Sequence, residues 1–297
     1  MGTTALRRRR PAFAAGLAAL AVALGSAAAP AAAAPPVPDV DLVAFGDSYT
    51  AGIGAGAYTT AAPCLQTDGG YVSLLLKLPV VGGNSANAAC AGAVLTDRPS
   101  DAVPSVMEQV AAAAAAGKLS VRTELVTVTA GPNDIDFTTP LKICASMPLD
   151  ACAQAVQRVR GALPAVQANL VEALTAVRRA APRATIVVFG YPLLFDPDGW
   201  PTLLTPEAQR LVNAGTLTLN GTIERAAESP RVKAKAVYVD VTRAFTGHTL
   251  NSAAPWINFN PADPFALQNF HPNAAGHEAY ADALEGAVNL GSLARRN

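Results

Sequence analysis

The sequence predicts an α/β fold in which a mostly parallel sheet carries helices on both faces. Short apolar or β-branched runs alternate with longer helical patterns along the chain after residue 38. Parallel strands need crossover connections, and these place the intervening helices on the two faces of the sheet. No internal repeat and no linker divides the chain after residue 34, so we expect one large domain with an extensive core.

Five strands are expected in this sheet. Each is a short apolar run bounded by turn residues, and the run Leu-Val-Thr-Val-Thr before Ala-Gly is the clearest. The second run has the weakest pattern. The expected strands span 41–45, 84–89, 125–129, 185–189 and 236–241.

Helices are expected between the strands. Gly117 suits the end of one helix, and Pro164 is expected to kink another or divide it in two. Thr205 and Pro206 have the residue types of an N-cap and a first helical position. The expected helices span 70–78, 103–116, 152–180, 205–227 and a terminal stretch that follows residue 273.

The first 34 residues have the pattern of a signal peptide. Residues 7–10 are arginines, residues 11–38 carry no charge, and 13–24 form an apolar core before a small-residue cleavage site at 32–34. A transmembrane anchor fits less well, because glycine, serine and proline interrupt a stretch that is only mildly apolar. We therefore expect a secreted protein, residues 35–297, without a stable membrane anchor.

The composition argues against nucleic-acid binding. Removing residues 1–34 takes four arginines from 22 basic residues, which leaves 18 against 22 acidic residues and a formal charge near −4. A mildly acidic chain without a basic run offers no attraction to a phosphate backbone.

Four cysteines in an exported chain predict two disulfides. Three pairings are possible, and the local one is the most economical: Cys64 with Cys90, and Cys144 with Cys152. The three histidines do not cluster with one another or with the cysteines as metal ligands would. We therefore expect neither a metal nor another cofactor.

Ser48 is the residue that points most directly to chemistry. The first apolar strand stops at Gly46, and Asp47 and Ser48 follow. Glycine tolerates backbone angles that allow a sharp turn, so Ser48 is presented at the carboxyl edge of the sheet, where open α/β sheets bind ligands. A serine in this position is often only a helix N-cap, so its partners decide its role.

Two downstream residues supply what a reactive serine needs. Asn133 follows the expected strand 125–129 and so reaches the same edge of the sheet, and His271 immediately precedes the last helix. Neutral imidazole is the usual base for serine, and an amide side chain with backbone N–H groups can stabilise an oxyanion. Each residue alone fits a turn or a cap, but the three together in this context indicate an acyl-transfer site.

These segments resemble the SGNH (GDSL) hydrolase family, in particular its secreted bacterial esterases and lipases. Four blocks stand in the family's order and span nearly the whole chain after the signal peptide: Phe45-Gly46-Asp47-Ser48-Tyr49, Asn87-Ala88-Ala89-Cys90-Ala91-Gly92-Ala93, Gly131-Pro132-Asn133-Asp134 and His271-Pro272-Asn273. The resemblance implies a three-layer α/β/α sandwich of the flavodoxin-like type. It also implies that Ser48 is the nucleophile and His271 the general base. The oxyanion hole would comprise the backbone N–H groups of Ser48 and Gly92 and the Asn133 amide.

The last block departs from the family pattern. Family members usually carry Asp three residues before the histidine, where this chain has Gln268. A carboxylate orients the imidazole and stabilises its positive charge, whereas glutamine offers only a neutral oxygen. Three acceptors remain open: a main-chain carbonyl, Gln268 and Asp263. The resemblance to secreted relatives thought to use a main-chain carbonyl favours a Ser-His dyad.

Other motifs fit less well. A glycine-rich run at 52–57 matches the dinucleotide-binding fingerprint but does not directly follow the strand. No G-x-S-x-G elbow is present, which argues against an α/β-hydrolase. We expect the remaining polar residues near the motifs to hold turns or to be structural: Asp47, Asp134, His248 and His277.

The sequence thus predicts a secreted carboxylic-ester hydrolase that works as a monomer through an acyl-serine intermediate on a small-molecule or lipid ester. Apolar segments at 191–195 and 255–257 favour a lipid-like acyl group, although the fold class does not identify it. Two alternatives remain: transfer of the acyl group to an alcohol instead of water, and a secreted lipid- or carbohydrate-binding protein without effective turnover.

Overall fold

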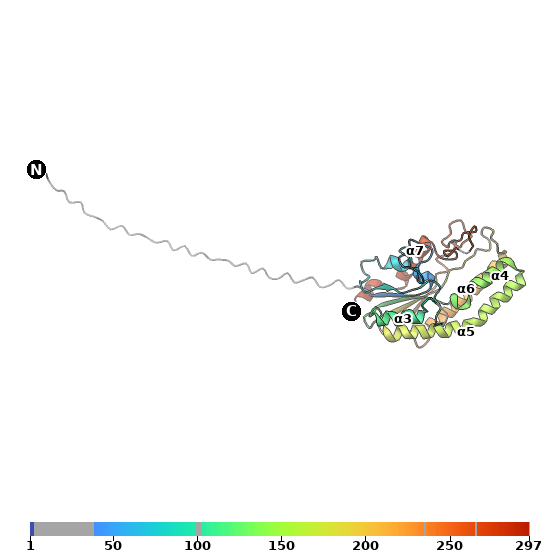
Figure 1. The fold of residues 1–297 in the computed structure, drawn as a ribbon, viewed down its shortest axis with the longest axis horizontal. Helices are drawn as coiled ribbons and strands as arrows, with labels where there is room; N and C mark the ends of the chain where they lie inside the picture. Colours follow the sequence, from blue (N-terminus) through green and yellow to red (C-terminus); the bar gives the residue numbers. More distant parts are fainter. Residues whose placement is uncertain (3–38, 99–101, 235, 265, 297) are drawn as a thin grey trace. The chain divides into compact units, whose positions relative to one another are not determined.

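A computed structural model describes residues 1–2, 39–98, 102–234, 236–264 and 266–296 (Figure 1). The chain divides into two compact units, Met1–Val37 and Pro38–Asn297, and the following description concerns the second. Apart from residues 1–2, the expected signal peptide lies outside the described residues. Within the described part, no helix combines the length and apolar character needed to cross a membrane.

A five-stranded parallel sheet forms the centre of the Pro38–Asn297 unit. Its strands are β1 (Leu42–Gly46), β2 (Ala86–Asn87), β3 (Leu125–Thr129), β4 (Thr185–Phe189) and β5 (Ala236–Val239). They lie in the order β2-β1-β3-β4-β5, and every neighbouring pair is parallel. This order is the flavodoxin-like one, and the strand order reverses between β1 and β3. The crevice at the carboxyl ends of these two strands is therefore the expected ligand site.

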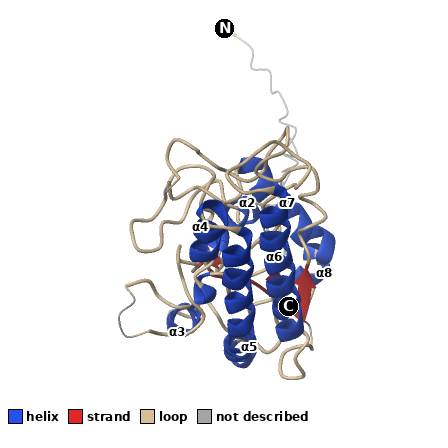
Figure 2. Ribbon diagram, turned by 90° about the vertical axis from the view of Figure 1, so that its right-hand side faces the viewer, coloured by secondary structure: helices blue, strands red, loops and turns tan. Residues whose placement is uncertain are grey.

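Helices cover both faces of the sheet, which makes the fold a three-layer α/β/α sandwich. In Figure 1, α3, α4, α5 and α6 lie on one side of the sheet and α7 lies on the other. Helix α2 packs against α7, and α5 packs along α6; Figure 2 shows α5 and α6 running alongside each other. The helices are α1 (Ser48–Ala51), α2 (Tyr71–Leu75), α3 (Val106–Ala115), α4 (Thr138–Ser146), α5 (Leu149–Ala180), α6 (Pro206–Ala227), α7 (Ala274–Ala287) and α8 (Leu290–Ala294), with the 3-10 turn η1 (Asn133–Ile135).

Most of the predicted elements are confirmed. The strands β3 and β4 and the helix α6 with its Thr205 N-cap have the predicted bounds. The central strands β1, β3 and β4 are buried along their whole length, as strands covered on both faces are.

Several elements differ from the prediction. The strand expected at 84–89 is only the two-residue β2, and the short helices α1, α4 and α8 are not predicted by the sequence pattern. Helix α5 begins at Leu149 and continues through Pro164 without dividing. Pro164 is exposed, so the carbonyl that loses its hydrogen bond lies on the solvent side of the helix.

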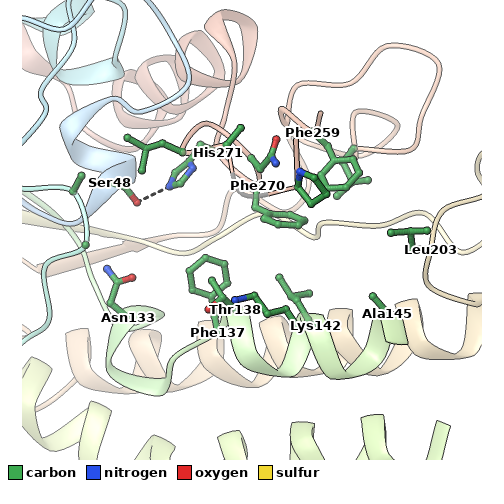
Figure 3. Close-up of a pocket in the computed structure, with 18 of the residues that line it drawn as sticks. Ser48, Asn133, Phe137, Thr138, Lys142, Ala145, Leu203, Phe259, Phe270 and His271 are labelled. Atoms are coloured by element: carbon green, nitrogen blue, oxygen red, sulfur yellow. Dashed lines mark hydrogen bonds between the residues drawn. The ribbon is translucent and has the colours of Figure 1, made fainter. Parts of the chain in front are cut away.

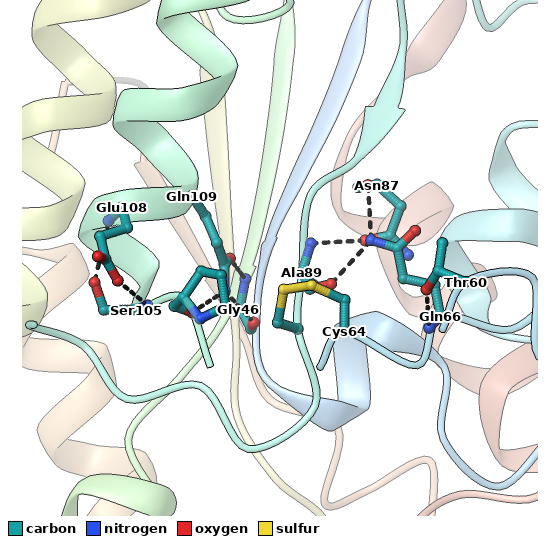
Figure 4. The surroundings of a disulfide bond; sticks show 11 residues. Gly46, Thr60, Cys64, Gln66, Asn87, Ala89, Ser105, Glu108 and Gln109 are labelled. Atoms are coloured by element: carbon teal, nitrogen blue, oxygen red, sulfur yellow. Dashed lines mark hydrogen bonds between the residues drawn. A yellow bond between two sulfur atoms is a disulfide. The ribbon is translucent and has the colours of Figure 1, made fainter. Parts of the chain in front are cut away.

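Two disulfides join the cysteines in the expected local pairs, Cys64–Cys90 and Cys144–Cys152. The first ties the loop after α1 to the loop after β2, and Gln66 strengthens this connection (Figure 4). The Gln66 amide donates to the carbonyls of Asn87 and Ala89, each at 2.9 Å. The second disulfide joins α4 to the first turn of α5. Segments without regular structure are thereby fixed next to the carboxyl edge of the sheet.

Gly46 ends β1 in a backbone conformation that only glycine adopts readily. Its φ is +138°, and a Cβ atom at this position would lie 2.1 Å from the carbonyl oxygen of Thr129 on β3. The Gln109 side chain from α3 satisfies the turn: its Oε1 accepts from the Gly46 N–H at 2.8 Å, and its Nε2 donates to the Gly46 carbonyl at 3.0 Å. This close approach brings Ser48, two residues later, to the crevice between β1 and β3.

We predict that Gly46→Ala destabilises the fold, because the side chain adds both backbone strain and a clash with β3. The free energy of unfolding, measured by urea denaturation, should fall by at least about 2 kcal/mol. Gly161→Ala is the matched control, since Gly161 lies inside α5 with open space around the added Cβ. It should raise the free energy of unfolding by about 0.5–1 kcal/mol. An unchanged urea midpoint for Gly46→Ala would contradict this account of the turn.

Candidate active site

Ser48 and His271 are hydrogen-bonded at the carboxyl edge of the sheet. Ser48 is the first residue of α1, directly after the turn that follows β1. Its Oγ lies 2.7 Å from Nε2 of His271, although 223 positions separate the two residues (Figure 3). A hydroxyl within hydrogen-bonding distance of a neutral imidazole is the geometry needed for proton transfer from a nucleophilic serine.

Asp47, which immediately precedes Ser48, has a buried carboxylate. It accepts hydrogen bonds from the Tyr49 N–H at 3.0 Å, from the Thr129 hydroxyl at 2.7 Å and from the Tyr191 hydroxyl. Desolvation by burial raises the pKa of Asp47 to about 6, against the lowering effect of these three donors. Asp47 caps α1 and connects it to β3 and to the segment after β4, in agreement with its expected role in the turn.

The segment that carries His271 is fixed through main-chain hydrogen bonds. The Tyr49 hydroxyl donates to the carbonyl of Phe270 at 2.7 Å, and the Asn258 N–H donates to the carbonyl of His271 at 2.8 Å. Phe270 has a φ of +64°, which is unusual for a bulky residue and turns the chain immediately before the histidine. Helix α1 therefore positions both Ser48 and the segment that carries His271.

The acceptor for Nδ1 of His271 is not the Gln268 side chain. Gln268 is exposed, and Nδ1 is buried without a hydrogen bond of good geometry to any described residue. Burial lowers the pKa of His271 to about 4, although the main-chain carbonyls of Asn269, Leu267 and Gln268 lie close enough to raise it in part. These carbonyls are the groups that face the imidazole from its own segment.

Gly92 and Asn133 line the same cavity as Ser48 and His271. Gly92 has a φ of +82°, and a Cβ on it would point into open space. Asn133 begins η1, and its Nδ2 donates to the carbonyl of Ala93 at 2.9 Å. A carboxylate oxygen of Asp134 accepts from the Leu95 N–H at 3.1 Å, so the loops after β2 and β3 are joined at two points. Of the five residues that the sequence analysis singled out, the structure thus brings four together in the wall of one cavity, whereas the fifth, Gln268, is exposed and does not line it.

A cavity of about 600 Å³ opens from Ser48 and is mostly apolar. This volume lies within the range of pockets for small molecules. Helix α4 forms one wall with residues three and four positions apart, and residues from 202–204, residue 264 and residues from 266–271 also line the cavity. The residues of α4 in this wall are Thr138, Leu141, Lys142 and Ala145. The sequence pattern does not identify α4, because the helix is short and carries a proline in its first turn.

Phe137, at the N-terminus of α4, lies where this cavity adjoins two smaller ones of about 70 and 80 Å³. Phe137 is the one described residue that lines all three. In Figure 3 its ring points from α4 toward His271 and Phe270. The cavity runs from Ser48 along α4 toward Leu203 (Figure 3).

The other two histidines lie outside this site. His277 is fully buried, accepts from the Tyr71 N–H at 3.3 Å and contacts the carbonyl of Ile53 at 3.1 Å through Nε2. His248 stacks on Trp256 with ring centroids 3.7 Å apart. Among the residues with described positions, no three metal-ligating side chains form a cluster.

Comparison with known proteins identifies the family. Residues 44–279 match the model of the GDSL-like lipase/acylhydrolase family. The chain belongs to this family. A lipase from Streptomyces rimosus is 30% identical over 275 residues, which cover 90% of this chain and 94% of the relative. Lipase 1 from Streptomyces coelicolor is 28% identical, with 92% of this chain and 97% of the relative covered.

Solved structures of GDSL hydrolases have the same fold. The extracellular lipase from Streptomyces rimosus aligns with a TM-score of 0.70 and 26% identity, over 84% of this chain and 100% of that one. Phospholipase A1 from Streptomyces albidoflavus NA297 aligns with a TM-score of 0.70 and 28% identity, over 83% and 98%. The activity of this GDSL family member is carboxylic ester hydrolysis.

We predict that the acidic limb of the pH profile lies unusually low for a histidine base. Because burial lowers the pKa of His271 from 6.5 to about 4, the imidazole stays neutral well below pH 6. The value of kcat/KM reports the free enzyme and should be half-maximal near pH 4.

Circular dichroism at each pH separates this effect from acid unfolding. The control is needed because burial also lowers the pKa of His277 to about 4. As the pH falls from 6.5 toward 4, both histidines bind protons more readily in the unfolded protein, so the folded protein loses stability. Burial also raises the pKa of Asp47 to about 6, so the result that would contradict the assigned environment of His271 is a midpoint at pH 6 or above that persists in a folded Asp47→Asn variant.

Proposed function

We propose that this chain is a secreted esterase or lipase in which Ser48 and His271 act as a catalytic dyad. The observation that carries the proposal is the 2.7 Å contact between Ser48 Oγ and His271 Nε2 in the wall of an apolar cavity of about 600 Å³. A nucleophile-base pair beside a cavity of this volume is suited to an ester with a hydrocarbon chain.

The proposed reaction has two halves. Ser48 Oγ attacks the ester carbonyl while Nε2 of His271 takes its proton, and the resulting imidazolium then protonates the departing alcohol. Water, deprotonated by His271, next attacks the acyl-serine, and the imidazolium returns the proton to Ser48 Oγ as the acid is released. In both halves the tetrahedral oxyanion would accept hydrogen bonds from the backbone N–H groups of Ser48 and Gly92 and from the Asn133 amide. The open space at the missing Cβ of Gly92 supports this assignment.

We propose that main-chain carbonyls, and not a carboxylate, orient the imidazole. The carbonyls of residues 267–269 face His271, whereas the side chain of Gln268 is exposed. Asp263 is also exposed and lies eight positions before the histidine. A low pKa is compatible with this arrangement, because burial lowers the pKa of His271 more than the neutral carbonyls raise it.

The substrate class we propose is a lipid ester whose acyl chain lies along α4. The cavity wall is mostly apolar, and the cavity runs from Ser48 along α4 toward Leu203. Relatives described as lipases and as a phospholipase A1 support a glyceride or phospholipid ester.

Secretion through a signal peptide, residues 1–34, is part of the proposal. The solved relative from Streptomyces rimosus is described as extracellular, and this chain has two disulfides. The remainder, 35–297, would be a single hydrolase domain, supported by the compact unit Pro38–Asn297. We expect it to act as a monomer, without a cofactor or a nucleic-acid partner.

Substitutions in the dyad test the mechanism. Ser48→Ala and His271→Ala should each lower kcat on p-nitrophenyl butyrate by at least about a thousandfold, because each removes a group that takes part in bond making or proton transfer. Gln268→Ala should retain activity within about threefold, since its side chain does not contact the imidazole.

The Asp263→Ala variant is the control for a hidden triad. A loss as large as that of His271→Ala, in a protein that still folds, would show that Asp263 orients the imidazole and would refute the dyad. Residual activity of Ser48→Ala within about tenfold of the unsubstituted protein, or about 1.4 kcal/mol in barrier, would refute the nucleophile.

A bulky residue at position 145 tests the path of the acyl chain. Ala145 lines the cavity seven residues after Thr138, which places it about 10 Å farther along α4. We predict that Ala145→Trp lowers kcat/KM at least tenfold for p-nitrophenyl laurate and less than twofold for the butyrate. Ser146→Trp adds the same bulk on the exposed side of α4 and should change neither value. Equal losses on both esters for Ala145→Trp would contradict the proposed path.

A further inference from the structure

Large apolar side chains are exposed where the cavity reaches the surface. Leu203 and Leu267 both line the cavity, yet their exposed fractions are 72% and 46%. Trp200, three residues before Leu203, is 62% exposed. Figure 3 shows Leu203 at the opposite end of the cavity from Ser48. Leu203 therefore lies at the outer end of the cavity and Trp200 precedes it in the same loop, whereas the backbone of Leu267 lies near the imidazole.

The loop that carries Trp200 is held in place, so this side chain is exposed in an ordered conformation. The Trp200 N–H donates to the carbonyl of Asn251 at 2.9 Å, and the Asn251 amide donates back to the carbonyl of Trp200 at 3.0 Å. The same amide donates to the carbonyl of Asp196 at 2.7 Å. Leu250, next to this anchor, lines the cavity. The loop that carries Trp200 is therefore hydrogen-bonded to a segment that lines the cavity.

We propose that Trp200 and Leu203 form a docking rim that enters the surface of an uncharged or zwitterionic lipid aggregate. This inference rests on the proposed lipid-ester function, because esters with chains that fill such a cavity assemble in water and do not remain dispersed. Tryptophan suits this position, since its ring has a large apolar area and a polar N–H that favours the boundary between lipid and water. A rim continuous with the cavity delivers one acyl chain to Ser48 without passing it through water.

The charges beside the rim favour uncharged lipid over anionic lipid. Asp198 pairs with Arg210 at 3.8 Å, and Arg210 also pairs with Glu207 at 3.8 Å. One arginine between two carboxylates leaves this surface net negative. Lys142 is the one lysine or arginine among the described residues that line the cavity, so this part of the structure offers no cluster of cations of the kind that holds proteins on anionic membranes.

Tryptophan fluorescence provides a direct test that does not need turnover. The chain has two tryptophans, so Trp256→Phe leaves Trp200 as the single tryptophan, and Ser48→Ala prevents hydrolysis. On addition of vesicles of ether-linked phosphatidylcholine, the Trp200 emission should shift to the blue as the ring leaves water. Vesicles with anionic ether lipid should bind no more tightly. An unshifted emission at saturating lipid would overturn the proposal.

Trp200→Ser and a matched control complete the test. Trp200→Ser removes the exposed ring, so it should lower binding to these vesicles, and the rate on a tributyrin emulsion, at least tenfold. Trp200 itself does not line the cavity. The rate of the variant on dissolved p-nitrophenyl butyrate should therefore stay within twofold. Val121→Ser is the control, because Val121 is 60% exposed but precedes β3, at the amino edge of the sheet opposite Ser48. It should change none of the three measurements.

The outcomes separate the docking rim from the proposed function. Equal effects of Trp200→Ser and Val121→Ser on vesicle binding would overturn the rim, as would equal losses of Trp200→Ser on emulsified and dissolved ester. Failure of the unsubstituted protein to hydrolyse p-nitrophenyl butyrate would refute the proposed function, while vesicle binding would still decide the rim.

Discussion

The buried carboxylate of Asp47 is the group on which the arrangement of the site depends. It receives hydrogen bonds from the start of α1, from Thr129 at the end of β3 and from Tyr191 after β4. These segments come from three different crossover units, and only the sheet brings their carboxyl ends together. Desolvating a carboxylate is costly, as its raised pKa shows, and three well-placed donors offset that cost. The result is that the start of α1, which carries Ser48, is held firmly against the sheet.

Tyr49 connects α1 to the segment that carries His271. Its hydroxyl holds the carbonyl of Phe270, and its ring lies 5.0 Å from Tyr191 and 5.5 Å from His271 between ring centroids. The residue after the proposed nucleophile therefore helps to position the residue proposed as its base. Burial by this aromatic cluster also keeps the imidazole neutral, which is the form that accepts a proton.

Cross-links between segments hold the walls of the cavity in place. The Cys64–Cys90 disulfide and the Gln66 amide hold the loop that carries Gly92, and Cys144–Cys152 holds the end of α4 against α5. A secreted enzyme can use disulfides in this way, because its surroundings keep them oxidised. Fixed walls suit oxyanion stabilisation, which requires donors that do not reorganise during the reaction.

The sequence by itself determined the elements whose signal is local. The β-branched run of β3, the cap and proline that begin α6, and the glycine that ends β1 each act over a few residues, and the structure has them where the pattern predicts. Motif order was also enough to predict that Ser48, Gly92, Asn133 and His271 would lie together.

Only the tertiary structure decided what depends on contacts between distant segments. The sequence left three acceptors open for the imidazole, and folding turned the Gln268 side chain to solvent while main-chain carbonyls came to face His271. Helix α4 and the role of Phe137 were likewise invisible, because a short helix is stabilised by packing more than by its own propensity. The cavity exists only where α4 meets loops from both the N-terminal and the C-terminal halves of the chain, and no local pattern encodes such a meeting.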